Sequence, residues 1–163
     1  MFRFAVAAVL LLAPAFARAE TFSIPSEDAV ATISIPEKWE PKPYDGGVEA
    51  NSPDGKVYLA VEMVAADDVK DAVKEGIEWF AKQGVEIDAD SMKTTESNGG
   101  GTSSFEMTFA GKDKDGPTAI SMSLVSSNTP KKFLLIYFWG APKDAEANQG
   151  ELKKIGDTLQ LTK

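Results

Sequence analysis

Residues 133–139 read Phe-Leu-Leu-Ile-Tyr-Phe-Trp, seven large apolar or aromatic side chains in a row. A strand with water on one face alternates apolar and polar residues, whereas a strand covered on both faces is apolar at every position. This run therefore predicts a central strand with other elements packed against both of its faces. Helices on the two sides of a sheet would provide that cover.

Three further segments alternate in the way that is typical of strands with one buried face. Apolar residues occupy every second position in 57–63, 105–109 and 120–124. Residues 112–117 join the last two segments, and their Asp115–Gly116 step is a strong signal for a hairpin turn. Residues 22–24 and 29–35 predict another short pair of strands.

Two helices are predicted as well. The first spans residues 67–84, with Asp67 or Asp68 as its N-cap and Gly84 at its end. The apolar positions that we expect to face the core are Val69, Val73, Ile77 and Phe80, and Ala72, Gly76 and Ala81 fill the same face. The second helix begins near Pro142, and its apolar stripe is Leu152, Ile155 and Leu159. The fold class is therefore α+β, an antiparallel β-sheet flanked by helices in an α-β-α sandwich.

Residues 1–19 have the parts of a secretory signal peptide. Arg3 precedes an apolar run that is too short to span a bilayer, and residues 17–19, Ala-Arg-Ala, fit the small-x-small pattern that signal peptidase cleaves. We expect cleavage between Ala19 and Glu20. The prediction is a soluble periplasmic or secreted protein with no membrane anchor and a single domain over residues 20–163.

Composition excludes several function classes. The chain contains no histidine and no cysteine, and its only arginines, Arg3 and Arg18, lie in the expected signal peptide. The remaining 15 lysines face 25 acidic residues, a net charge of about −10. Such a surface repels phosphates and lacks the bidentate arginine fork, so no nucleic-acid binding is expected. No disulfide can form.

Catalytic side chains are scarce too. The common general base and the thiolate nucleophile are both missing, and neither Ser-x-x-Lys, Gly-x-Ser-x-Gly nor a glycine-rich phosphate loop occurs. Asp113 and Asp115 suggest a calcium loop, but counting from Gly116 places the first and twelfth ligand positions on Gly111 and Met122. We expect no catalytic residue, no metal site and no cofactor.

The first predicted helix carries a row of carboxylates. They are Asp67, Asp68, Asp71, Glu75 and Glu78, and lysines at 70, 74 and 82 alternate with them. This pattern indicates a solvated face with ion pairs four residues apart. A weak divalent-cation site is the alternative.

Segment 39–47, Trp-Glu-Pro-Lys-Pro-Tyr-Asp-Gly-Gly, places two aromatic residues among residues that break regular structure. We expect a loop here. Aromatic side chains on loops often anchor contacts, so Trp39, Tyr44 and Asp45 are the candidate binding residues. For Trp39 we favour the alternative that it covers the end of the sheet, since tryptophan is usually well buried.

The order of these pieces resembles the Mog1/PsbP-like (DcrB-like) fold superfamily. Residues 35–39, Ile-Pro-Glu-Lys-Trp, are similar to the strand and Pro-x-x-Trp that open this fold, and residues 151–159 are similar to its closing helix. The resemblance covers nearly the whole chain after residue 19. It implies an antiparallel sheet between helices.

What members of this superfamily share is binding to other proteins rather than a reaction. The resemblance therefore implies a non-enzymatic protein-binding or accessory module with a protein partner. It carries over no functional residue, because the histidines linked to metals in photosystem members and the acylated cysteine of lipoprotein members have no counterpart here. The alternatives are a small-ligand or divalent-cation carrier and, third, an enzyme that uses carboxylates or a Ser/Lys pair.

Overall fold

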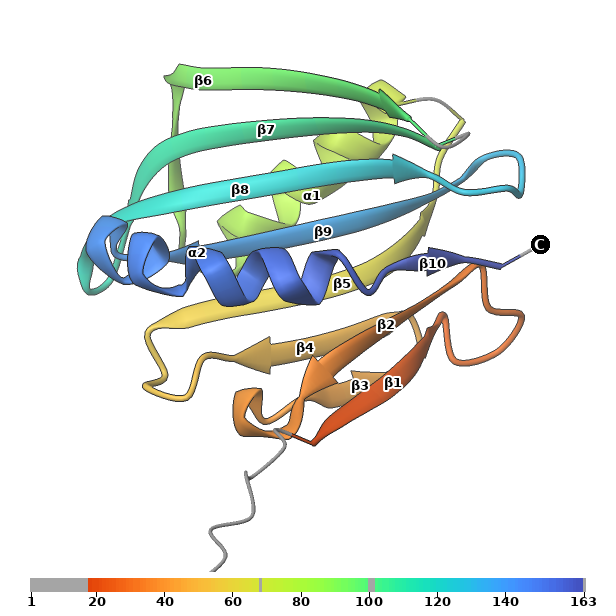
Figure 1. The fold of residues 1–163 in the computed structure, drawn as a ribbon. Helices are drawn as coiled ribbons and strands as arrows, with labels where there is room; N and C mark the ends of the chain where they lie inside the picture. Colours follow the sequence, from red (N-terminus) through yellow and green to blue (C-terminus); the bar gives the residue numbers. More distant parts are fainter. Residues whose placement is uncertain (1–17, 68, 100–101, 163) are drawn as a thin grey trace, which may run out of the picture.

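The computed structural model describes residues 18–67, 69–99 and 102–162 (Figure 1). All but the last two residues of the expected signal peptide lie outside these ranges. The described strands form two antiparallel sheets. The larger sheet has the order β3 (Lys42–Tyr44), β4 (Gly47–Asn51), β5 (Val57–Ala65), β9 (Lys132–Gly140), β8 (Gly116–Ser126), β7 (Thr102–Asp113) and β6 (Glu86–Gly99). The smaller sheet has the order β1 (Ala19–Ile24), β2 (Ala31–Pro36) and β10 (Gln160–Leu161).

The larger sheet is the middle layer of the molecule. Helix α1 (Val69–Lys82) covers one face, while helix α2 (Pro142–Gly156) and the smaller sheet cover the other (Figure 1). The α+β class and the antiparallel sheet flanked by helices are thus confirmed. The second outer layer is mixed, because strands β1, β2 and β10 bury their apolar side chains beside α2. None of the described helices is long and apolar enough to cross a bilayer.

Strand β9 has the central place that its sequence predicts, between β5 and β8. Leu134 packs on the α2 side of the sheet, Leu135 and Tyr137 pack on the α1 side, and all three are fully buried. The three alternating segments form β5, β7 and β8. The predicted hairpin is also present, with Asp113 opposite Gly116 and residues 114–115 in the turn.

The buried face of α1 is narrower than the expected one, of which it keeps Phe80 and two small residues. Ala72, Gly76 and Phe80 are buried, whereas Val69 and Ile77 are 43% and 39% exposed. The helix lies close to the sheet: a Cβ added to Gly76 would lie 2.3 Å from Met122 Sδ. Only small side chains fit at this contact, so the larger Val69 and Ile77 lie at its sides.

The C-terminal end of α1 is the one that the sequence predicts. Gly84 has a φ of +77°, its N–H donates to Ala81 O, and the N–H of Val85 donates to Phe80 O. This is the Schellman arrangement that glycine favours. At the other end Asp67 forms an ion pair with Lys131 (2.7 Å), and Asp68 lies outside the described residues.

Segment 39–47 is not the irregular loop that its prolines and glycines suggest. Residues Glu37–Trp39 form a short 3-10 turn, and β3 pairs with β4 around a tight turn at residues 45–46. Pro43 is tolerated in a strand because β3 is an edge of the sheet, where a missing N–H need not break a ladder.

Candidate functional site

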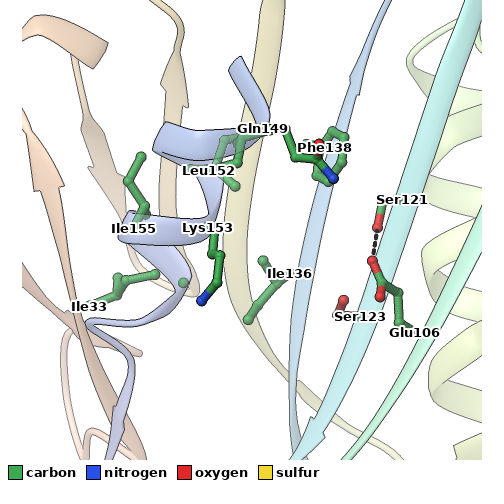
Figure 2. Close-up of a pocket in the computed structure, with 12 residues that line it drawn as sticks. Ile33, Glu106, Ser121, Ser123, Ile136, Phe138, Gln149, Leu152, Lys153 and Ile155 are labelled. Atoms are coloured by element: carbon green, nitrogen blue, oxygen red, sulfur yellow. Dashed lines mark hydrogen bonds between the residues drawn. The ribbon is translucent and has the colours of Figure 1, made fainter. Parts of the chain in front are cut away.

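A groove of about 270 Å³ runs between α2 and the larger sheet (Figure 2). Its apolar residues come from β2, β5, β9 and α2: Ile33, Leu59, Ile136, Phe138, Leu152 and Ile155. Its polar residues come from β7, β8 and α2: Glu106, Ser121, Ser123, Gln149 and Lys153. The groove therefore has an apolar floor and a polar rim.

The groove exists because side-chain size falls sharply from β9 to β8. Phe138 lies opposite Ser121, and Ile136 lies opposite Ser123, on the same face of the sheet. The two serines are too small to fill the space beside their large neighbours. Ile136 and Phe138 consequently stay only partly buried, although the adjacent residues Leu135 and Tyr137 are fully enclosed on the other face.

The charged groups at the rim already have partners. The hydroxyl of Ser121 donates to Glu106 Oε1 (3.0 Å), and Lys153 forms an ion pair with Asp157 (2.8 Å). An incoming group therefore meets charged side chains that already have partners and an unfilled apolar floor. This arrangement suits an apolar side chain carried by a polar segment.

Of the three candidate binding residues, Trp39 lies on the α2 side of the sheet and is 0% exposed. Its indole N–H donates to Glu151 Oε2 (2.9 Å), and Lys38 also pairs with Glu151. These contacts join the 3-10 turn to α2. Lys38, and then Trp39, hold the pKa of the Glu151 carboxyl below its usual range. The ring occupies the position of a covering residue rather than of a surface contact.

Tyr44 lies on the other side of the sheet, facing α1. It is 39% exposed, and its hydroxyl donates to Glu62 Oε2 (2.8 Å). Asp45 is exposed in the turn after β3, where its carbonyl oxygen accepts the N–H of Ser26 (3.3 Å). The structure thus separates Trp39 from Tyr44 and Asp45, and none of the three lines the groove beside α2.

The carboxylate row on α1 forms a shallow hollow that includes Asp71 and Glu75. Two of its other acids form ion pairs, Glu78 with Lys74 (3.8 Å) and Asp67 with Lys131 (2.7 Å). Among the described residues, no group of three or more acidic side chains is placed to hold a metal ion.

Sequence reasoning missed the groove, because its lining residues come from distant parts of the chain. One local signal was available. Ser121 and Ser123 lie on the same face of β8 as Val125, which is buried in the core. Apolar residues at positions 121 and 123 would have continued that buried face, and two small polar residues stand there instead. Their pairing with Phe138 and Ile136 appears only once the register of β8 and β9 is known.

No protein-family model and no curated protein sequence matches the chain. Solved structures do share its fold. PsbP from the cyanobacterium Synechocystis sp. PCC 6803 is 11% identical, covers 96% of this chain and 99% of its own, and superposes with a TM-score of 0.61. LpqN of Mycobacterium tuberculosis, described as involved in cell envelope biogenesis, is 12% identical, with 89% and 92% covered and a TM-score of 0.54.

The Ran-binding protein Mog1p of Saccharomyces cerevisiae is 10% identical, with 88% of this chain and 95% of its own covered and a TM-score of 0.50. Identities this low show the fold alone. The chain has the Mog1/PsbP-like fold, as the resemblance of its sequence implied.

Proposed function

We propose that this protein is a non-enzymatic binding module of the periplasm or cell exterior, and that it holds a segment of a protein partner in the groove beside α2. The observation that carries this proposal is the partly buried pair Ile136 and Phe138 at the floor of an open groove. Covering such apolar area with a partner removes it from water and lowers the free energy of the system.

The size of the groove favours side chains of a partner over a free cofactor. Its volume of about 270 Å³ lies below the range of roughly 300–1,000 Å³ that small-molecule pockets occupy. A peptide segment could place one or two apolar side chains on Ile136 and Phe138. Its backbone groups would then meet Ser123 and Gln149 at the rim.

Two further observations support the proposal. Mog1p, which has the same fold, is a Ran-binding protein, so this architecture can present a surface to a protein. The signal-peptide pattern of residues 1–19 supports export, and LpqN, another protein of this fold, acts in cell envelope biogenesis.

The test fills the groove without removing a core contact. Ser123→Leu places a larger side chain beside Ile136, and Ser97→Leu makes the same change on the same sheet face at edge strand β6, away from the groove. A photoreactive residue at Gln149 would capture the partner in extracts of the source cells. We expect Ser123→Leu to reduce the cross-linked partner by about tenfold or more, equivalent to about 1.4 kcal/mol, and Ser97→Leu to leave it unchanged. Equal capture by both variants, at equal thermal stability, would contradict the proposal.

A further inference from the structure

A second pocket lies on the opposite face of the sheet, between α1 and strands β3, β4 and β5. We call it the tyrosine pocket. Its volume is about 350 Å³, and its main lining residues are Tyr44, Glu49, Tyr58, Glu62, Trp79 and Gln83. It shares no residue with the groove beside α2.

Two carboxylates in this pocket are held by tyrosine hydroxyls. Tyr58 donates to Glu49 Oε2 and Tyr44 donates to Glu62 Oε2, both at 2.8 Å. Burial, together with the adjacent carboxylates, raises the pKa of both tyrosines, so their hydroxyls stay protonated and act as donors. The two glutamates are therefore the acceptors of these hydrogen bonds.

Neither carboxylate is neutralised by a cation of the described chain. No lysine or arginine in the described ranges lies within ion-pair distance of Glu49 or Glu62. Lys42 stands at the exposed rim and faces Glu49 in the strand register, but it forms no ion pair with it. Two half-buried carboxylates without a counter-ion attract a cation from outside.

The walls of the pocket suit a cation that carries a carbon chain. The rings of Tyr58 and Trp79 lie 5.8 Å apart at an interplanar angle of 34°, and the rings of Trp79 and Tyr137 lie 4.4 Å apart. Aromatic faces attract cations through their quadrupole and also pack against methylene groups. A bare metal ion would gain little from such walls.

A buried tyrosine packs behind one wall of the pocket, because the ring of Tyr137 lies against that of Trp79. Tyr137 is 0% exposed, and among the described residues its hydroxyl is the one buried side-chain polar atom without a hydrogen-bond partner. Burial and the nearby charge of Glu62 raise the pKa of Tyr137, so this hydroxyl stays protonated. A ligand with N–H groups would give it the missing partner.

We propose that the tyrosine pocket binds an alkylammonium group, the chemistry shared by a small primary amine and the end of a lysine side chain. The ammonium lies between Glu49 and Glu62 and donates to their free oxygens and to the hydroxyl of Tyr137. Its carbon chain packs on Trp79 and Tyr58. This site is independent of the function proposed for the groove, because it lies on the other face of the sheet.

The experiment titrates the protein with n-butylammonium and follows the indole N–H resonances of its three tryptophans by NMR. The signal of Trp79 should shift, and that of Trp39, on the other face of the sheet, should not. Neutral n-butanol has nearly the same shape and should bind at least about tenfold more weakly, because it lacks the charge. Equal binding of the alcohol would overturn the proposal.

Two variants and a matched control locate the site. Glu49→Gln and Glu62→Gln should each weaken n-butylammonium by about tenfold, while Glu96→Gln, on edge strand β6 four strands from β5, should not. If both pocket variants bind as tightly as the unmodified protein, or if calcium shifts the Trp79 signal and the amine does not, the proposal fails. If a variant does not fold, the comparison of n-butylammonium with n-butanol on the unmodified protein still tests the proposal.

The two sources of the ammonium are then distinguished with a lysine-containing peptide. Tighter binding of an Nα-acetyl-lysine peptide than of n-butylammonium identifies the lysine of a protein as the ligand. Tighter binding of the free amine identifies a small molecule. A peptide with norleucine in place of lysine should not bind to the pocket, and its equal binding would count against an ammonium site.

Discussion

Replacing Gly76 by alanine should destabilise this protein, although the same change usually stabilises a helix. Alanine in a helix interior is favoured over glycine by about 0.5–1 kcal/mol, because glycine loses more conformational freedom on folding. At Gly76 the new methyl carbon would lie 2.3 Å from Met122 Sδ and 3.7 Å from Leu135 Cδ1. Met122 is fully buried, so it must move within a packed core.

The magnitude follows from two opposing effects. Overpacking a core costs about 1–3 kcal/mol, and the helix propensity of alanine offsets about 0.5–1 kcal/mol of it. We expect a net loss of about 1 kcal/mol in the free energy of unfolding. Gly150, in the middle of α2, is the matched control, because a Cβ there would have no neighbour within 4 Å. Gly150→Ala should therefore gain about 0.5–1 kcal/mol.

Urea unfolding followed by circular dichroism measures both variants. The two should differ by about 2 kcal/mol, which corresponds to roughly 4–8 °C in Tm for a domain of this size. In a Met122→Ala background, which removes the obstructing sulfur, Gly76→Ala should become as favourable as Gly150→Ala. Equal gains for the two single variants in the unmodified background would show that α1 does not lie this close to the sheet.

Three other expectations concern the α2 contact and the chain start. Trp39→Phe removes the N–H that donates to Glu151 and should lower the free energy of unfolding at pH 7 by about 1.5–3 kcal/mol; an unchanged urea midpoint would contradict this role. The pKa of Glu151 is lowered from its ordinary 4.5 in the folded state, so its contribution is present above pH 4.5 and is lost as the pH falls through the folded value. Glu151→Gln should accordingly cost stability at pH 7 and progressively less below pH 4.5, whereas a pH-independent difference would argue against the ionised contact. Finally, intact-mass measurement of the exported protein should place the N terminus at Glu20, and a mass that retains residues 1–19 would exclude cleavage there.

Sequence periodicity was sufficient for the elements in which one physical effect dominates. The apolar run of β9, the alternation of β5, β7 and β8, and the Asp-Gly hairpin each carry a local signal that burial reinforces. Strand β6 carries no such signal, since Glu86–Gly99 is a mostly polar edge strand. It is a strand because β7 offers a hydrogen-bonding partner, which its own side chains do not reveal.

The expected face of α1 was too wide for a related reason. Helical spacing predicts that Val69 and Ile77 face the core because both are hydrophobic. The helix lies so close to the sheet, however, that only small residues fit between them, and Ala72 and Gly76 are the residues at this contact. The helical spacing places both small residues on the expected face, but it does not show that they, and not Val69 and Ile77, make the contact with the sheet. The groove and the tyrosine pocket depend on strand register and on contacts between distant segments, which no single stretch of sequence contains.

The smaller sheet has a consequence for the order in which the chain can fold. Strand β2 pairs with β1 near the start of the described chain and with β10 near its end, and Thr162 hydrogen-bonds to Ala29 and Val30. A nascent chain can close the β1–β2 hairpin early, because that contact is local. The other edge of β2 stays open until residues 160–161 have been made, and closing so long a loop carries the largest entropic cost. Until that moment this edge of β2 remains unpaired and open to pairing with other chains.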